Sequence, residues 1–170
     1  MTPTGCTSNP LNRKGKALIA AAGLGLLVPI CLRISGRTPA LLWEGLAFAF
    51  GCVFLWLTLR YLFIRYRYEI DMTTDGRRFL FIACLKGNRS VEQARMPLED
   101  LRFVRFLSEK EADALDEIPD NLPLHRYHAQ LFPDRLLYLV FESEGEKVVL
   151  ALDADETFAE ALRTCLPQDV

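Results

Sequence analysis

Two apolar stretches near the start of the chain decide its fold: residues 17–32 read ALIAAAGLGLLVPICL, and residues 41–59 read LLWEGLAFAFGCVFLWLTL. The first stretch carries no charge, and the second carries only Glu44. At 1.5 Å per residue, a helix over residues 17–34 is about 27 Å long, which nearly matches the hydrocarbon core of a bilayer. The sequence therefore predicts two transmembrane helices, over residues 17–34 and 40–62.

The connection between these helices, residues 34–39, is too short for anything except a turn. The helices are therefore expected to run antiparallel and side by side, as a transmembrane hairpin over residues 17–64. Trp43 and Trp56 lie near the two ends of the second stretch, where an aromatic belt would place them. Small residues four positions apart would let the two backbones approach: Ala21 with Gly25, Gly45 with Ala49, and Ala47 with Gly51.

Basic residues flank the hairpin on both sides, and we call six of them the basic collar: Arg13, Lys14, Lys16, Arg60, Arg65 and Arg67. At the other end of the hairpin lie only Arg33, just before the connection, and Arg37 within it. Because positively charged flanks stay on the cytosolic side, both termini are predicted to be cytoplasmic in a multi-pass protein of the cell membrane. The collar has two compatible uses, to set this orientation and to attract anionic lipid headgroups.

Two features near the apolar stretches have alternative interpretations. Basic residues before an apolar stretch are also typical of a cleaved signal peptide, but no small-residue cleavage site follows residues 17–32, which favours a retained span. Glu44 is either a functional carboxylate inside the membrane or, one turn from the start of its helix, a side chain that reaches the aqueous interface.

Charge is divided unevenly along the 170 residues, whose formal net charge is −2. The first 64 residues hold six bases and one acid, a net charge of +5, and the rest hold 14 bases and 21 acids, a net charge of −7. An acidic soluble part argues against a nucleic-acid partner, because phosphate backbones are bound through clustered positive charge. The five cysteines are scattered and form no CxxC spacing, which favours reduced thiols in a cytosolic domain.

Residues 65–170 predict a soluble domain of short strands, whereas residues 1–16 predict a disordered, basic N-terminal flank. Apolar and polar residues alternate from Tyr66, and turn residues recur at short intervals, as at Asp75-Gly76. Seven antiparallel strands are predicted, over residues 66–72, 78–86, 90–96, 101–107, 124–130, 136–142 and 147–152. An acidic connection, residues 108–123, has room for one helical turn.

A C-terminal amphipathic helix completes the predicted fold. Asp153 or Asp155 can cap it, and one apolar stripe is formed by Phe158, Leu162, Cys165 and Leu166. The fold class is therefore α+β: a transmembrane hairpin, then a seven-stranded antiparallel sandwich or barrel whose open end is closed by this helix.

This order of elements resembles the membrane-anchored bacterial proteins with a pleckstrin-homology-like (PH-like) domain of the YcxB-like type. Three stretches carry the likeness: Tyr68-Glu69-Ile70, Met96-Pro97-Leu98-Glu99-Asp100-Leu101, and Val149-Leu150-Ala151-Leu152-Asp153 followed by Phe158 and Leu162. The resemblance implies a binding or scaffolding module at the inner face of the membrane, with no cofactor. Eukaryotic relatives of the fold bind phosphoinositides at a basic loop, but the corresponding residues 73–78 hold two bases and one acid, so that specificity is not carried over.

Residues with catalytic or metal-binding chemistry are few. His125 and His128 are the only histidines, and on a strand positions three apart face opposite ways, so no metal site is predicted. Cys84 lies within an apolar strand, as a buried structural thiol does. The sequence thus predicts no catalytic constellation and no enzyme.

The function expected from these patterns is a membrane-anchored, non-enzymatic binding module that contacts membrane lipids through its hairpin and a protein partner through its domain. One alternative is an accessory subunit of a transporter, or a small membrane enzyme, in which Glu44 or the histidines carry the chemistry. Another is a sensor whose domain associates with a second copy of itself.

Overall fold

The computed structural model describes residues 4–8, 13–34, 40–114, 122–131 and 133–166. The chain forms two compact units. One is the helical hairpin, Pro10–Ile64, and the other combines Met1–Asn9 with Arg65–Val170.

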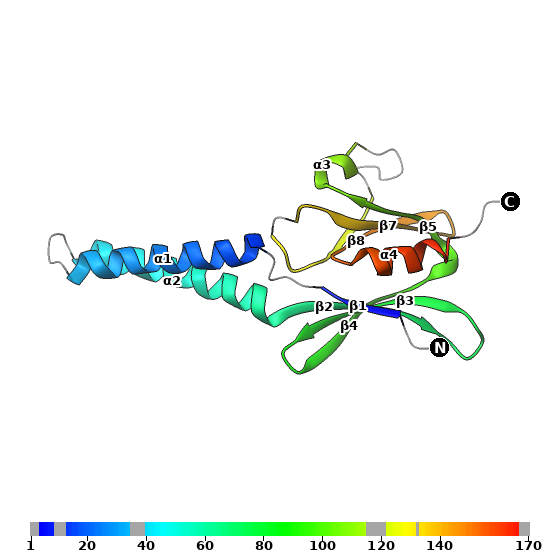
Figure 1. Ribbon diagram of the computed structural model, residues 1–170, viewed down its shortest axis with the longest axis horizontal. Helices are drawn as coiled ribbons and strands as arrows, with labels where there is room; N and C mark the ends of the chain where they lie inside the picture. The colour runs from blue at the N-terminus through cyan, green and yellow to red at the C-terminus, as the bar shows by residue number, and fades with distance from the viewer. Residues whose placement is uncertain (1–3, 9–12, 35–39, 115–121, 132, 167–170) are drawn as a thin grey trace. The chain divides into compact units, whose positions relative to one another are not determined.

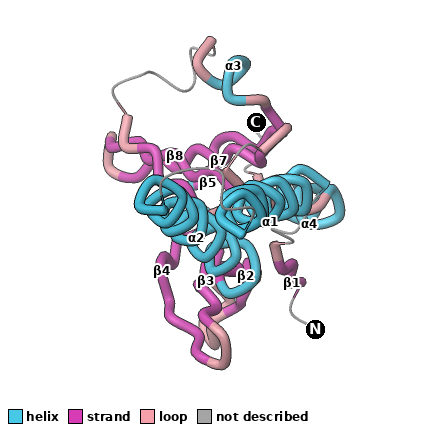
Figure 2. The backbone as a smooth tube through the Cα atoms, turned by 90° about the vertical axis from the view of Figure 1, so that its left-hand side faces the viewer, coloured by secondary structure: helices cyan, strands magenta, loops and turns pink. Residues whose placement is uncertain are grey.

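The hairpin consists of helix α1 (Arg13–Ile34) and helix α2 (Ala40–Phe63), which lie side by side (Figures 1 and 2). Both helices are long and apolar enough to cross a membrane. Helix α1 begins four residues before the predicted position 17. The prediction followed the apolar stretch alone, whereas lysine and arginine also have high helix propensity and extend the helix toward the N-terminus. The turn predicted between the helices falls on residues 35–39, outside the described residues.

Glycines of α1 form the contact with α2. A Cβ atom on Gly25 would lie 2.8 Å from Cε1 of the Phe50 ring, and one on Gly23 would lie 3.4 Å from Cε2 of Phe54. The lower residue number on α1 contacts the higher residue number on α2, so the two helices are antiparallel. Small residues on one helix thus receive aromatic rings from the other.

One four-stranded sheet, sheet A, has the order β1-β2-β3-β4. Its strands are β1 (Thr4–Thr7), β2 (Ile64–Met72), β3 (Arg78–Lys86) and β4 (Arg89–Pro97). Strand β1 corrects the prediction that residues 1–16 form a disordered flank: Thr4–Thr7 pair antiparallel with β2, from Thr4 opposite Ile70 to Thr7 opposite Arg67. A segment that precedes the hairpin thus joins the sheet that follows it.

The other four-stranded sheet, sheet B, has the order β5-β7-β8-β6. Its strands are β5 (Leu101–Leu107), β6 (Leu124–Tyr127), β7 (Leu136–Ser143) and β8 (Glu146–Leu152). The prediction of seven strands, all antiparallel, is wrong in two respects. The described residues contain eight strands, and β6 pairs parallel with β8, from Leu124 opposite Val149 to Tyr127 opposite Leu152.

Three short helical segments complete this unit: the 3-10 helix η1 (Leu98–Asp100), helix α3 (Glu109–Ala112) and helix α4 (Glu156–Arg163). Asp155 caps α4, because its carboxylate accepts a hydrogen bond of 2.7 Å from the Phe158 amide. Helix α3 begins with a capping box, in which Ser108 and Glu111 satisfy each other's backbone amides.

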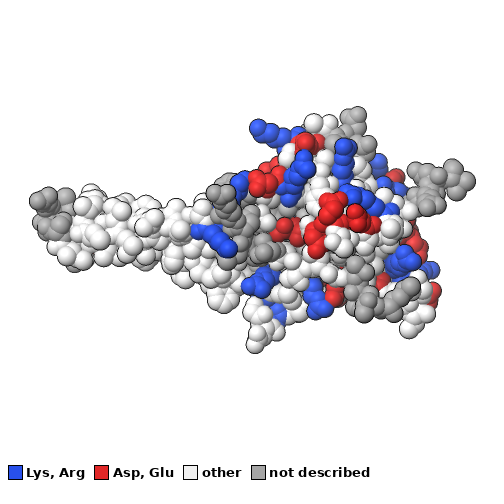
Figure 3. Space-filling model, in the orientation of Figure 1, with Lys and Arg blue, Asp and Glu red and all other residues white. Residues whose placement is uncertain are grey.

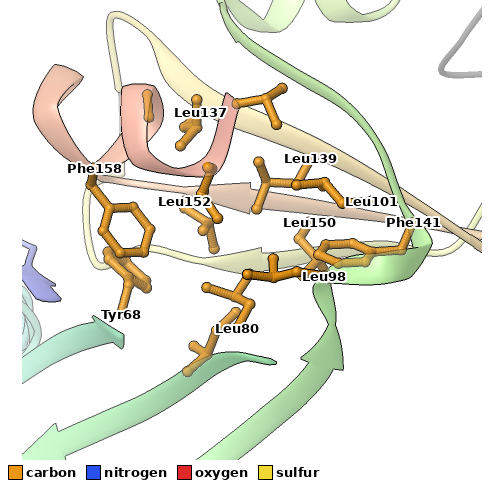
Figure 4. Packing of buried hydrophobic residues seen from close by; sticks show 14 residues of the cluster. Tyr68, Leu80, Leu98, Leu101, Leu137, Leu139, Phe141, Leu150, Leu152 and Phe158 are labelled. Atoms are coloured by element: carbon orange, nitrogen blue, oxygen red, sulfur yellow. The ribbon is translucent and has the colours of Figure 1, made fainter. Parts of the chain in front are cut away.

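One apolar core lies between the two sheets and α4 (Figure 4). Sheet A contributes Tyr68 and Leu80, sheet B contributes residues such as Leu139, and α4 contributes Phe158. The rings of Tyr68 and Phe158 face each other with their centroids 6.2 Å apart. The predicted stripe on α4 is confirmed, since Phe158 and Leu162 are buried and Cys165 and Leu166 pack against the same core.

A second apolar cluster covers the opposite face of sheet B. Alternate residues of β7, such as Tyr138 and Val140, point into it, while Ala112 of α3 and Leu122 cover them. The two described ends of the acidic connection are thus packed against the domain. The chain as a whole is α+β: a hairpin of two long apolar helices, two four-stranded sheets and a C-terminal helix.

Candidate functional site

The hairpin exposes an apolar surface over most of its length. The side chains of Ile34, Leu41 and Phe48 are 80%, 84% and 76% exposed. The face of the hairpin that is visible in Figure 3 is almost free of charged atoms. Leaving this much apolar surface in water is unfavourable by about 25 cal/mol per Å². A surface of this kind suits hydrocarbon or another apolar helix.

Part of the basic collar gathers at one end of the hairpin. Lys14 and Lys16 are exposed on the first turns of α1, and Arg60 lies on the last turn of α2. The antiparallel arrangement puts these turns at the same end (Figure 1). The guanidinium of Arg60 lies 5.8 Å from the centroid of the Trp56 ring, a distance that permits a cation–π contact. Arg13 is the first residue of α1, and its side chain lies outside the described residues.

The remaining collar residues, Arg65 and Arg67, are exposed on strand β2. They are two positions apart and so share one face of sheet A. Arg67 forms an ion pair with Glu69, which partly neutralises it. The described part of the collar therefore has two parts. Lys14, Lys16 and Arg60 form a cationic end of the hairpin, and Arg65 and the ion-paired Arg67 belong to the other unit.

A polar cluster joins β2 to the segments around β6 and β8. The hydroxyl of the fully buried Tyr68 donates to the carbonyl of Tyr127 at 2.6 Å and accepts from the amide of Asp153 at 3.2 Å. The Asp153 carboxylate accepts from Nε2 of Gln130 at 2.9 Å. Burial raises the pKa of both Tyr68 and Asp153. Because the hydroxyl acts both as donor and as acceptor, this cluster fastens strands together and engages the Tyr68 proton in a hydrogen bond to a backbone carbonyl.

Strand β1 and Ser8, the residue that follows it, add two side chains next to this cluster. Ser8, only 3% exposed, exchanges hydrogen bonds with Tyr66: its amide donates to the Tyr66 carbonyl and its hydroxyl accepts from the Tyr66 amide, both at 2.8 Å. Cys6 packs against the core, and burial raises the pKa of its thiol. A thiol with a raised pKa is a poor nucleophile, and the packing of Cys6 against the core is that of a structural residue.

An open pocket of about 260 Å³ lies where the turn between β2 and β3 meets η1 and the end of α4, and it is lined by Gly76, Arg77, Arg78, Leu98, Glu99, Thr164 and Cys165. Arg78 donates to Sγ of Cys165 at 3.5 Å. The pocket is smaller than most small-molecule sites, which range from about 300 to 1,000 Å³. Its shape does not suggest a deep binding cavity.

The other residues considered from the sequence lie apart from one another. His125 is exposed on β6, where its ring stacks on Tyr127 with centroids 6.3 Å apart, and His128 follows the end of that strand. Cys84 is buried in β3, as its apolar setting predicts. Glu44 is exposed in the second turn of α2. Among the described residues, no three His, Cys, Asp or Glu side chains are grouped so that they could hold a metal ion.

The outer edge of strand β4 is the longest edge that either sheet presents. Strand β4 has nine residues, and the other edge strands, β1, β5 and β6, have four, seven and four. All but three residues of β4 are exposed, including the apolar Val91 at 48%. Within the described part of the chain, no strand pairs with this edge. The sequence predicts the strand but not its place at an edge, because strand order depends on long-range pairing.

No protein-family model matches this chain, and a search of curated proteins also finds no match.

Three features of the described residues therefore remain as candidates for function: the apolar surface of the hairpin, its cationic end, and the outer edge of β4. All three are exposed features rather than enclosed cavities. The buried polar cluster is a weaker candidate, since its hydrogen bonds are made within the domain. The open pocket is also a weaker candidate, since it is small.

Proposed function

We propose that the chain is a membrane-anchored, non-enzymatic binding module. In this proposal the hairpin crosses the cell membrane twice, and the soluble domain lies at its cytoplasmic face. The domain is PH-like and engages a protein partner along the outer edge of β4. That exposed nine-residue edge is the observation that carries the proposal.

Membrane insertion is supported by the exposed apolar surface of α1 and α2 and by the pairing of β1 with β2. Strand β1 precedes α1 and strand β2 follows α2, so the two ends of the hairpin are tied to one sheet. Two membrane crossings return the chain to the side on which it began, as this pairing requires. The pairing also favours retention of α1 over cleavage as a signal peptide, because cleavage after α1 would remove β1 from the sheet.

A cytoplasmic domain is supported by the charges at the end of the hairpin. Lys14, Lys16 and Arg60 all lie at the end that leads into the soluble domain, and positive charge is retained on the cytosolic side. The five cysteines are free thiols, as in proteins of a reducing compartment. The same cationic end is suited to anionic headgroups, each charge contributing about 1 kcal/mol near such a surface.

The PH-like assignment is supported by the succession of seven strands, β2 to β8, followed by α4 and packed around one core. Two features depart from the seven-stranded pattern that the resemblance implies. Strand β1 adds a segment from before the hairpin, and β6 pairs parallel rather than antiparallel at the edge of sheet B. Both departures leave the outer edge of β4 open.

An open strand edge binds a partner by adding a strand, with main-chain hydrogen bonds giving affinity and alternate side chains giving specificity. Strand β4 also carries features that limit indiscriminate pairing: Arg89, Glu92 and Arg95 are exposed charges, and the register shifts near Gln93. A charged and irregular edge is therefore suited to a particular partner rather than to any exposed strand.

Photo-crosslinking tests this proposal. A photoreactive amino acid at Val91 in the full-length, membrane-inserted protein should give a defined adduct with a protein. The same amino acid at Glu146, the exposed first residue of β8, is the control and should not give that adduct. Failure of position 91 to give any adduct, in membranes where the protein is folded, would contradict binding along β4.

A further inference from the structure

We propose that the partner along β4 is a second copy of this chain, paired antiparallel through the same edge. This inference rests on the proposed function of β4 as a binding edge. It follows from a self-complementary pattern of charge and apolar residues along the strand.

The faces of β4 follow from its pairing with β3. Arg95 lies opposite Phe81 and Glu92 lies opposite Ala83. Positions 81 and 83 are two apart and share one face of β3, so Arg95 and Glu92 also share a face. This is the outer face of sheet A, where the guanidinium of Arg95 lies 4.7 Å from the centroid of the Phe79 ring.

The other face of β4 carries its apolar side chains. Val91 lies opposite Cys84, and Met96 lies opposite Leu80. Positions 80 and 84 are four apart and share a face, so Val91 and Met96 share the face that turns toward the core. Met96 packs against that core, whereas Val91 is left 48% exposed.

One antiparallel register joins two copies of β4 with all of these residues matched. It places Glu92 of each copy opposite Arg95 of the other, which makes two cross-strand pairs of opposite charge. It also places Val91 of each copy opposite Met96 of the other. Directly opposite residues in antiparallel strands interact most strongly, and opposite charges there are favourable while like charges are not. A register centred on Glu92 would instead set Glu92 against Glu92.

The bulge in β4 fits the same arrangement. Ala94 lies opposite Ile82 and Glu92 lies opposite Ala83, so Gln93 is the extra residue. In the proposed pair the twofold axis falls between positions 93 and 94. The bulges of the two copies therefore lie next to each other, with Gln93 of each copy opposite Ala94 of the other. The alternation of faces stays in phase on both sides of the axis, as a bulge matched to a bulge allows.

Charge reversal in a mixed population tests the proposal. Two differently tagged full-length chains are expressed together, membranes are solubilised mildly, and the fraction of one chain that co-purifies with the other is measured. Glu92→Arg in both chains sets the introduced arginine against Arg95, and Arg95→Glu in both sets the introduced glutamate against Glu92. Either change should lower the co-purified fraction about five-fold or more. One chain with E92R and the other with R95E should pair about as well as wild type. In this mixed pair the introduced arginine lies opposite the introduced glutamate, and the native Arg95 of one chain lies opposite the native Glu92 of the other. Both cross-strand pairs are therefore of opposite charge.

Reversals at Glu146 and Lys147, the first two residues of β8 and both exposed, are the matched controls and should leave the fraction unchanged. Failure of wild-type chains to co-purify, or co-purification that the β4 reversals do not alter, would overturn the second-copy inference. The adduct formed from position 91 separates this failure from that of the proposed function. An adduct with a different protein keeps the binding edge and excludes the second copy, whereas no adduct rejects both.

Discussion

Gly25 of α1 lies directly against the aromatic ring of Phe50 on α2, so closely that a Cβ atom on the glycine would lie 2.8 Å from Cε1 of the ring. Real Cβ atoms essentially never approach another heavy atom this closely. The absence of a side chain at position 25 therefore sets the distance between the two helices. Gly45 on α2 differs, since a Cβ there would meet nothing within 4 Å among the described residues.

Gly25→Leu should loosen the hairpin, because its side chain would have to displace the Phe50 ring. We expect a loss of about 1–3 kcal/mol, the usual cost of overpacking a close contact. Gly45→Leu is the matched control, with the same gain in helix propensity and no steric conflict. Thermal unfolding in detergent micelles measures both variants. Equal melting temperatures for the two would show that Gly25 does not set the helix contact.

Tyr68→Phe should destabilise the soluble domain by about 1–3 kcal/mol, because the carbonyl of Tyr127 and the amide of Asp153 would each lose a partner in a buried setting. Tyr138→Phe is the control, because among the described residues the Tyr138 hydroxyl makes no hydrogen bond. Urea unfolding followed by far-ultraviolet circular dichroism compares the two. A Tyr138 variant that loses as much stability as the Tyr68 variant would contradict this role for the hydroxyl.

Asp153 should make the domain less stable as the pH rises. Burial raises its pKa above the ordinary value of 3.8, so the folded chain holds this proton more tightly than the unfolded chain. Its contribution is therefore present below the unfolded pKa and is lost as the pH rises through the folded pKa. Asp153→Asn keeps an oxygen that can accept from Gln130 and carries no charge. Urea midpoints are measured at pH 3, 5 and 7. The midpoint of the variant, relative to that of wild type, should increase as the pH rises.

The exposed Asp75 provides the control for this pH series. The difference in urea midpoint between Asp75→Asn and wild type should be the same at all three pH values. A constant difference between Asp153→Asn and wild type across the series would mean that Asp153 does not titrate as proposed.

Ser8→Ala should weaken the attachment of β1, since the Tyr66 amide loses the hydroxyl that accepts its hydrogen bond in a buried position. The expected cost is about 1–3 kcal/mol. Thr7→Ala changes the neighbouring residue, which is exposed at the end of β1, and should cost no more than about 0.5 kcal/mol. Protection of the Cys6 thiol from alkylation reports on the strand directly. Unchanged protection in Ser8→Ala would contradict the proposed attachment.

Local patterns in the sequence predict much of this architecture. Alternation from Tyr66 and the turn at Asp75-Gly76 predict β2 and β3, and the spacing of Phe158 and Leu162 predicts α4. Each of these signals depends on a residue's own neighbours. The limits of a helix are less apparent, because the first turn of α1 carries Arg13, Lys14 and Lys16 rather than apolar residues.

Pairings between distant segments cannot be predicted in this way. The TGCT of β1 is short and shows no alternation of apolar and polar residues, and it gains its structure only by joining β2. The parallel alignment of β6 with β8 likewise depends on a pairing between residues far apart in the sequence. The basic collar is visible in the sequence, whereas the open edge of β4 is not, because its exposure follows from the order of strands.

The most direct test of a membrane-anchored cytoplasmic module is its topology in the cell. Single cysteines are placed at Gly36, between the two helices, and at Ser143, at the end of β7, in chains whose native cysteines are replaced by alanine. A membrane-impermeant thiol reagent is then applied to intact cells. The account predicts labelling at position 36, and at position 143 only after the membrane is opened. Labelling at position 143 but not at position 36 in intact cells would contradict it and place the domain outside.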